Sequence, residues 1–349
     1  MNVYSQIGDG TSTDRSSPVQ TIAGGSNWAQ VSCGAFHTAA IKNDGSLWLW
    51  GLNTDGELGT DSTNPAASPV QTVCGGLIWT QVSVGQQMTA AIKGDGTLWA
   101  WGYNAFGGLG DNSNTARSSP VQIVGTNWHQ VSAGNMFSGA VKTDGTLWTW
   151  GNNYFGQLGD GSNTHRSSPV QTIAGGYNWA KVSCGYRHVA AINRNKELWT
   201  WGENDQGPLG DDTAAPRSSP VQTVASGNLW KSASAGGRLT GALETTCPNQ
   251  PVVSSYQGSY TSGGEFYCYY GDLVTIYGSN LSSIASITIV TDDGDIPVGG
   301  NIVGWSTGVN SLSFNAYIDS GVPSFDGHIV ICFDDCPCIF GAGFHFINQ

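Results

Sequence analysis

Five of the eight cysteines lie in the last third of the chain, and thiols have the widest range of chemistry of any residue type present: Cys247, Cys268, Cys332, Cys336 and Cys338. Such a group can form one or two disulfides, remain as buried free thiols, or bind a metal ion. Zinc sites favour cysteine pairs separated by two to four residues, and only Cys332 and Cys336 fit that spacing. The pattern therefore favours disulfides, with free thiols and then a metal site as alternatives.

Three carboxylates lie close together in the same region, at Asp292, Asp293 and Asp295. Calcium prefers oxygen ligands, and carboxylates in a turn can supply them. Their spacing does not fit the twelve-residue calcium loop, whereas Asp-Asp-Gly-Asp is typical of a solvated hairpin turn. We therefore predict a turn without a metal ion and keep calcium as the alternative.

The sequence contains no recognisable arrangement of catalytic residues. It has no Gly-x-Ser-x-Gly elbow, no phosphate-binding loop and no paired-histidine metal motif. The histidines are scattered, and two of them, His37 and His188, occupy nearly equivalent positions of a repeat, as residues with a structural role would. We predict that the protein is not an enzyme, with no catalytic residues and no cofactor.

Arginine recurs before a Ser-Ser-Pro sequence in all units but one, where Ala66 takes its place: Arg15, Arg117, Arg166 and Arg217. A ring of arginines could bind anions. An ion pair that braces a loop is the favoured interpretation, because the same units carry an aspartate directly after a Gly-x-Leu-Gly turn: Asp9, Asp111, Asp160 and Asp211.

These side chains belong to an internal repeat of about fifty residues. The run Leu-Trp-x-Trp-Gly occurs at residues 47–51, 98–102, 147–151 and 198–202, and each copy leads into the Gly-x-Leu-Gly turn and then Ser-Pro-Val-Gln. The tryptophans that recur in register are Trp50, Trp101, Trp150 and Trp201, and then Trp28, Trp79, Trp128, Trp179 and Trp230.

Each unit offers four short strands, with an Asp-Gly turn such as Asp44-Gly45 between the third and the fourth. A four-stranded unit repeated radially is a propeller blade. We predict an all-β fold in which residues 1–245 form a β-propeller of about five four-stranded blades, one of them incomplete. The tryptophans are assigned to packing between blades, which leaves only Trp305 free to bind a ligand such as a glycan.

The pattern x-Leu-Trp-x-Trp-Gly-x-Asn-x-x-Gly-x-Leu-Gly resembles the repeat of the regulator of chromosome condensation family over about residues 2–245. The resemblance implies a propeller, commonly with seven blades, whereas this chain has five units. The best-known activity of that family is guanine nucleotide exchange on a small GTPase. We consider that activity less favoured here, because of the acidic balance and the absence of a basic tail.

The repeat is incomplete at both ends. Residues 6–10 align with residues 157–161, so the first unit lacks its Trp-x-Trp strand, and the last unit stops at the strand of residues 239–243. Joining the ends would give one blade of three strands. This blade is expected to close the ring unaided, to be completed by residues after Cys247, or to accept a strand from a neighbouring chain.

Residues 246–349 have a different rhythm, with expected strands over residues 271–281, 285–290, 311–318, 327–333 and 344–347. This spacing predicts a separate acidic β-sandwich. The run Gly-x-x-Val-Thr-Ile-x-Gly-x-Asn-Leu that begins at Gly271 resembles the immunoglobulin-like domains shared by plexins and some transcription factors. The resemblance implies a spacer or adhesive module.

Charge is distributed unevenly along the chain. No Lys or Arg follows Arg238, and nine acidic residues lie between Glu265 and Asp335, in a chain of net charge −12. An acidic module repels phosphate backbones and anionic lipids, so we expect neither nucleic-acid binding nor membrane insertion. The expected partners are other protein subunits of an assembly, with a host-surface receptor or glycan as a further possibility.

The favoured function is a structural or adhesive surface protein of a bacteriophage virion, such as a head decoration, fibre or tail protein. Its support is the pairing of the two modules, a surface rich in Asn, Ser, Thr and Gly, and an N-terminus that does not resemble a signal peptide. The expected location is therefore the virion, exposed outside the cell. A secreted or cell-surface adhesin and a glycan-binding propeller remain alternatives.

Overall fold

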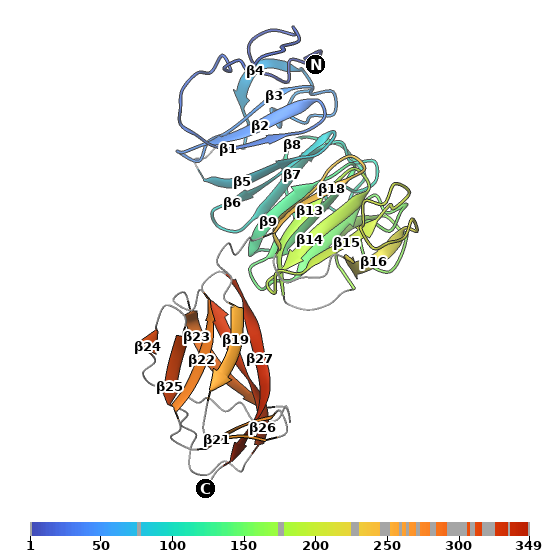
Figure 1. The fold of residues 1–349 in the computed structure, drawn as a ribbon. Helices are drawn as coiled ribbons and strands as arrows, with labels where there is room; N and C mark the ends of the chain where they lie inside the picture. The colour runs from blue at the N-terminus through green and yellow to red at the C-terminus, as the bar shows by residue number, and fades with distance from the viewer. Residues whose placement is uncertain are drawn as a thin grey trace. The chain divides into compact units, whose positions relative to one another are not determined.

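The computed structural model describes residues 2–74, 78–173, 178–224 and 230–244 with their side chains, and the backbone of nine strands between residues 252 and 347. The chain divides into two compact units, Met1–Glu244 and Thr245–Gln349. All regular elements in the described residues are β-strands (Figure 1).

The first unit contains four antiparallel sheets of four strands and one pair of strands, which we number as blades 1 to 5 in chain order. Blades 1 and 2 consist of β1 (Trp28–Cys33), β2 (His37–Lys42), β3 (Leu47–Gly51), β4 (Ala66–Gln71), β5 (Trp79–Val84), β6 (Met88–Lys93), β7 (Leu98–Gly102) and β8 (Arg117–Gln122). Blades 3, 4 and 5 consist of β9 (Trp128–Ala133), β10 (Phe137–Lys142), β11 (Leu147–Gly151), β12 (Arg166–Gln171), β13 (Trp179–Cys184), β14 (His188–Asn193), β15 (Leu198–Gly202), β16 (Arg217–Gln222), β17 (Trp230–Ala235) and β18 (Thr240–Glu244).

The Asp-Gly hairpins show how the repeat folds locally. Asp44 accepts hydrogen bonds from the backbone and hydroxyl of Ser46, at 2.9 and 2.6 Å, and the Ser46 hydroxyl in turn accepts one from the Trp48 indole at 2.8 Å. Gly45 has a φ of 80°, which glycine adopts without steric cost. The turn therefore sets the register of β2 and β3, which are the third and fourth strands of the sequence unit and the second and third of the blade. It also orients the first tryptophan of the Leu-Trp-x-Trp-Gly strand.

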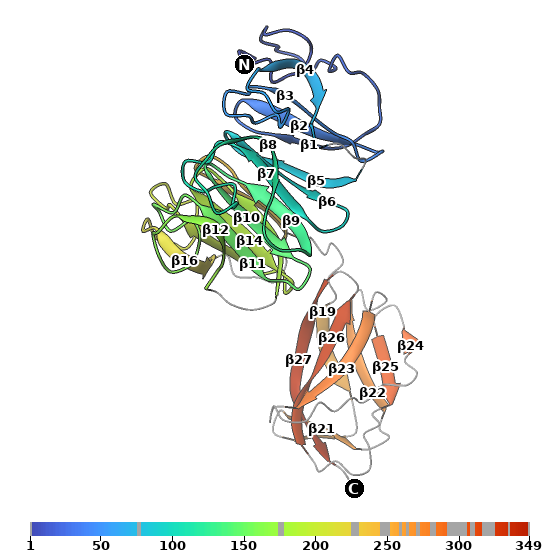
Figure 2. The ribbon, with the colours of Figure 1, turned by 180° about the vertical axis from the view of Figure 1, so that it is seen from behind.

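The second tryptophan of that strand fills the space between consecutive blades. Trp101, Trp150 and Trp201 are completely buried, and each packs edge to face or tilted against the tryptophan that begins the inner strand of its own blade. Burying so large an apolar side chain stabilises each junction by about 2–3 kcal/mol. Blades therefore pack in chain order, as Figure 2 shows from the far side.

The predicted all-β propeller with four-stranded antiparallel blades is confirmed for blades 1 to 4. Among the described residues blade 5 has two strands, because β18 pairs with β17 and residues 17–20 do not form a strand. The expected three-stranded closing blade is therefore wrong for this structure. No strand with the Leu-Trp-x-Trp-Gly pattern is available there to join residues 17–20 to β18.

The second unit contains two sheets, with strand orders β19-β22-β25-β24 and β20-β21-β27-β26-β23. Their strands are β19 (Val252–Gln257), β20 (Tyr260–Ser262), β21 (Glu265–Tyr269), β22 (Leu273–Ser279), β23 (Ile284–Thr291), β24 (Ser306–Thr307), β25 (Ser311–Asn315), β26 (Phe325–Phe333) and β27 (Cys336–Ile347). All pairings are antiparallel except that of β21 with β27. The immunoglobulin-like assignment remains a prediction.

Candidate functional site: the two end faces of the blade arc

Consecutive blades are joined by a hydrogen bond that repeats at every junction. The hydroxyl of a serine on the inner strand accepts a bond from a backbone N–H of the next inner strand, at 2.9–3.0 Å: Ser32 from Val84, Ser83 from Ala133, Ser132 from Cys184 and Ser183 from Ala235. Gln30 adds two bonds to the backbone of Val82, at 3.0 and 3.1 Å. The junction is therefore directional: side-chain groups of one blade bond to backbone groups of the next, and the serine hydroxyls act as acceptors.

Blade 5 carries the acceptor side of such a junction, and none of the described blades packs against that side. Ser234, the equivalent of the four junction serines, is exposed. Leu239 and Leu243 are 65% and 66% exposed, whereas Phe137 and Ile192 at the equivalent positions are 0% and 3% exposed. We call Ser234, Leu239 and Leu243 the C-end face.

Blade 1 likewise exposes the donor side of a junction, because none of the described blades packs against it. Val31 is 64% exposed, whereas Val82 and Val182 at the equivalent positions are 2% and 4% exposed. Cys33 is exposed, and Trp28 is only half-buried. We call Trp28, Val31 and Cys33 the N-end face.

The two faces match each other chemically. The backbone N–H of Cys33 is equivalent to the four donors of the internal junctions, and the Ser234 hydroxyl is equivalent to the four acceptors. Val31 on one face and Leu243 on the other belong to positions that are buried at internal junctions. Each face therefore carries one half of the junction that holds consecutive blades together.

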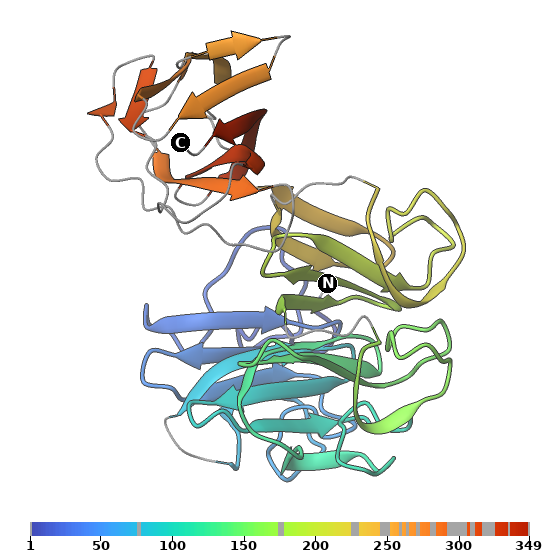
Figure 3. The ribbon, with the colours of Figure 1, turned by 90° about the horizontal axis from the view of Figure 1, so that it is seen from below.

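The turns that follow the inner strands of all five blades lie around one axis. Figure 3 shows the blades from below, coloured from blue for blade 1 to olive and tan for blade 5. They line a cavity of about 360 Å³ to which all five blades contribute. Tyr186 donates a backbone hydrogen bond to the Gly236 carbonyl at 2.9 Å. A Cβ added to Gly34 would lie 2.2 Å from the Gly85 carbonyl oxygen, whereas the three atoms nearest to one added to Gly236 belong to Leu239 and lie 3.5–3.7 Å away. The expected five-unit ring is therefore an open arc.

The arginines brace loops, as predicted. Arg117 contacts Asp111 at 2.7 Å, and equivalent ion pairs of 2.6–2.9 Å join Arg15 to Asp9, Arg166 to Asp160 and Arg217 to Asp211. Asn104, buried in the same loop, donates to Asp111 and accepts a bond from the Leu109 backbone at 3.0 Å. Bonds from Ser113, Arg117 and Asn104 lower the pKa of the Asp111 carboxyl, although burial opposes the shift.

The histidines in equivalent positions also have a structural role. His37 is completely buried and its Nε2 lies 2.9 Å from the Thr89 hydroxyl, while His188 Nε2 lies 3.0 Å from that of Thr240. Burial lowers the pKa of His37 to about 3 and that of His188 to about 4. Both imidazoles are therefore neutral at physiological pH, and each bridges two blades.

The other candidate residues are placed as follows. Within the described side chains, no group of three or more His, Cys, Asp or Glu residues is arranged to hold a metal ion. Asp292, Asp293 and Asp295 lie outside the described residues, as do the side chains of Cys247, Cys268, Cys332, Cys336 and Cys338. Cys74 is half-buried and Cys184 is buried. Cys33 occupies the same repeat position as the buried Cys184, yet it is exposed, because no blade formed by the described residues covers the outer face of β1.

Sequence reasoning missed the end faces. Val31, Leu239 and Leu243 look like ordinary core positions of the repeat, and nothing in their residue types marks them as exposed. The available signal was the unit count, because a repeat that does not close leaves the core positions of its first and last units without partners. In the described part of the chain, no helix is long and apolar enough to cross a membrane.

Comparison with known proteins agrees with the geometry. The sequence model of the RCC1-like domain matches residues 1–250. The ultraviolet-B receptor UVR8 of Arabidopsis thaliana is 32% identical over 243 residues, which cover 69% of this chain and 44% of that protein.

Among solved structures, human WBSCR16 superposes with a TM-score of 0.61 at 23% identity, covering 70% of this chain and 66% of that one. Prp20p of Saccharomyces cerevisiae gives 0.56 at 17% identity, covering 63% and 57%. The likeness to these two structures concerns the fold alone. The chain spans less than half the length of UVR8 and less than two thirds of either solved chain.

Proposed function

The chain belongs to the family of RCC1-like domains, and from that premise we propose that it is a non-enzymatic structural protein whose copies join end to end. The observation that carries the proposal is the match between the two end faces. Val31, Leu239 and Leu243 are about 65% exposed on these faces, whereas Val82, Val182, Phe137 and Ile192 at equivalent positions are at most 4% exposed. Exposed apolar surface of this kind marks an interaction site.

A second copy of the chain is the occupant that supplies the missing half of each junction. Its Val31 and the Cys33 N–H would meet Leu243 and the Ser234 hydroxyl of the first copy, as Val182 and the Cys184 N–H meet blade 3 within one chain. The two faces differ, so the contact is head to tail. Such heterologous contacts generate closed rings or open filaments.

The setting we propose is a virion surface, where the chain would contact other subunits and a host receptor or glycan. The support is compositional: Lys, Arg, Asp and Glu make up 11% of the residues, and the polar surface is built largely from uncharged side chains. Residues 1–245 carry 13 basic and 16 acidic side chains, a net charge of 13 − 16 = −3, so the blades of two copies meet without strong mutual repulsion. A secreted adhesin built from the same end-to-end contacts is the alternative setting.

The proposal is tested by light scattering and electron microscopy of the full chain and three variants. We expect multimers for the natural chain, and monomers for Val31→Glu and Leu243→Glu, because a buried unpaired carboxylate would oppose the junction. Val124→Glu is the matched control, since Val124 is 82% exposed in the loop between β8 and β9, outside both end faces. A monomeric natural chain, or glutamate variants that assemble like the control, would refute end-to-end assembly.

Ultraviolet-B sensing is a second candidate, favoured by the name of the plant relative and by the tryptophan arrangement. The ring centroids of Trp28, Trp79 and Trp128 each lie 6.0–6.3 Å from that of a second tryptophan in the same blade. Lys42 lies over the rings of both Trp28 and Trp48. If this candidate holds, irradiation at wavelengths that tryptophan absorbs changes the mass in solution reversibly, and an unchanged mass eliminates it.

A further inference from the structure

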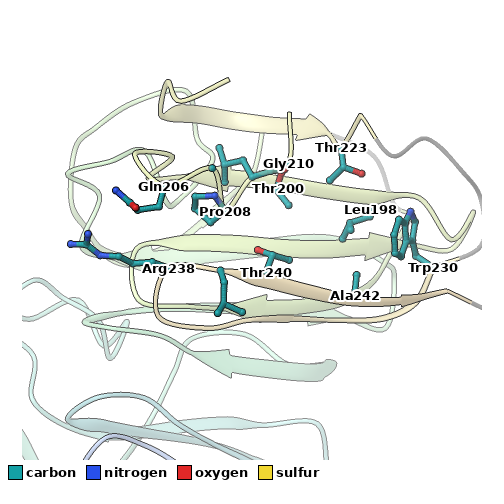
Figure 4. Close-up of a pocket in the computed structure, with 13 residues that line it drawn as sticks. Leu198, Thr200, Gln206, Pro208, Gly210, Thr223, Trp230, Arg238, Thr240 and Ala242 are labelled. Carbon is teal, nitrogen blue, oxygen red and sulfur yellow. The ribbon is translucent and has the colours of Figure 1, made fainter. Parts of the chain in front are cut away.

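A cavity of about 340 Å³ lies between parts of blade 4 and blade 5 (Figure 4). On one side it is lined by Leu198, Thr200 and the turn of residues 206–210, and on the other by Trp230, Thr240 and Ala242. The lining combines apolar surface with a few hydroxyl and carbonyl groups, as ligand pockets do. Arg238 and Asp205 lie 3.7 Å apart in the same region.

At the four other turns of this kind, the equivalent space is filled by a tryptophan from the third strand of the following blade. The indole packs so closely on the second glycine of the Gly-x-Leu-Gly turn that an added Cβ would lie 2.6–2.9 Å from its Nε1: Gly8 beneath Trp50, Gly59 beneath Trp101, Gly110 beneath Trp150 and Gly159 beneath Trp201. In three of them the indole N–H donates to a carbonyl of the same turn at 2.7–2.9 Å, namely that of Gln6, Glu57 or Gln157.

The fifth turn has the same glycine but no tryptophan. A Cβ added to Gly210 would find its nearest neighbour, a methyl carbon of Thr223, at 3.9 Å. The carbonyl equivalent to those of Gln6, Glu57 and Gln157 belongs to Pro208, which lines the cavity. The cavity is therefore an indole slot, shaped by the repeat and vacant in the described part of the chain.

The strand that would carry such an indole also has a place to pair. In blade 4, β14 pairs on one side with β13 and on the other with β15, where Val189 lies opposite Trp201. In blade 5, β18 pairs only with β17 among the described strands. The Gly236 N–H donates to the Leu239 carbonyl in the hairpin between β17 and β18. Residues 239, 241 and 243 therefore direct their backbone groups toward β17. Ladder bonds alternate along a strand, so Thr240 and Ala242 direct their backbone groups to the open edge.

We propose that this edge and slot form a binding site for an extended segment of a partner protein that adds to blade 5 as its third strand and places a tryptophan in the slot. The occupant's chemistry follows from the four filled equivalents: a β-strand with an indole directly before a glycine. Strand addition of this kind takes its affinity from main-chain bonds and its specificity from a side-chain pocket. A second copy of the chain cannot donate the strand while it stays folded, because its own tryptophan-bearing strands are buried within blades 1 to 4.

The proposal does not rest on end-to-end assembly. Thr240 and Ala242 line the slot toward blade 4, whereas Leu243 belongs to the C-end face and does not line the slot; Leu239 borders both surfaces. Successive side chains of a strand point to opposite faces, so each surface can be altered without the other.

The test is a titration of the full chain against a fluorescently labelled peptide of the sequence Asn-Lys-Glu-Leu-Trp-Thr-Trp-Gly-Glu, which reproduces residues 195–203. Fluorescence anisotropy should show saturable binding of one peptide per chain. Trp201→Ala in the peptide should weaken binding by about tenfold or more, because the large buried aromatic supplies most of the contact. No binding of the natural peptide, or equal binding of the alanine peptide, would overturn the proposal.

Ala242→Pro in the chain is the matching variant, because it removes an N–H directed at the open edge and leaves the bonds to β17 in place. It should abolish peptide binding while end-to-end assembly and thermal unfolding stay unchanged. Leu243→Glu should show the reverse, with assembly lost and peptide binding kept. An Ala242→Pro chain that assembles normally and still binds the peptide would show that strand addition is not the mode of binding.

Discussion

At the scale of single residues, the junctions between blades depend on buried polar groups that each have a defined partner. His37 and His188 bridge to hydroxyls of the following blade. Phe137 occupies the same position in blade 3 without any polar atom. The position thus tolerates both kinds of side chain, and the histidines add a dependence on pH that the apolar residues do not.

We predict that acid weakens the fold through His37 and that His37→Met reduces this effect. The pKa of His37 is lowered to about 3 from an ordinary value of 6.5, so between these values the unfolded chain binds a proton that the folded chain does not. The free energy of unfolding therefore falls as pH falls below 6.5, by about 2 kcal/mol at pH 5 for this residue.

Urea unfolding at pH 7 and pH 5 measures the effect. Met88 is 1% exposed at the equivalent position, so methionine should fit the site with little loss of packing. The natural chain should lose about 2 kcal/mol more than His37→Met over this interval. Equal losses in the two proteins would show that His37 takes up a proton without disturbing the fold.

At the scale of elements, the loop after each third strand is held by an aspartate and an arginine in all units but one. The second unit has Thr60 and Ala66 where the third has Asp111 and Arg117, so both partners are missing together. Asp111 is 2% exposed in its side chain and Arg117 is 40% exposed. The ion pair is thus partly buried. We expect it to stabilise the fold by about 0.5–1 kcal/mol, the upper part of the range for exposed ion pairs.

We predict that Thr60→Asp combined with Ala66→Arg stabilises the natural chain, whereas either change alone does not. The single aspartate would be a desolvated carboxylate without its counter-ion, and the single arginine would have no acceptor. A double-mutant cycle by thermal unfolding measures the coupling, expected at about 0.5–1 kcal/mol. Additive effects of the two changes would mean that the loop of the second unit does not adopt the geometry of the others.

Most strands, turns and ion pairs of the blades could be predicted from the sequence, because a feature that recurs in register in several units rarely arises by chance. The strand with Trp101, the Asp44-Gly45 hairpin and the pairing of Arg117 with Asp111 all recur in register, and the structure confirms each. Cys33 and Val31 could not be predicted in the same way. Their burial depends on whether a blade precedes them, and local sequence carries no information on that. The vacant slot beneath Gly210 likewise results from a strand that is absent, so no residue of its lining signals it.

At the scale of the whole first unit, the account is that of an open arc whose ends complement each other. Ring closure would have covered Val31 and Leu243 in the way that internal junctions cover Val82 and Ile192. The arc instead leaves one donor face and one acceptor face, which is the arrangement that a head-to-tail assembly requires. The indole slot adds a second, separate surface through which a partner protein could be recruited.

The most direct test of the end-to-end contact is a mixing experiment with Val31→Glu and Leu243→Glu, measured by light scattering. Each variant retains one intact face, so each alone should be monomeric, and an equimolar mixture should form pairs with twice the mass of one chain and nothing larger. That result would establish a directional contact between the two faces. A mixture that stays monomeric, or variants that pair with themselves, would contradict the account.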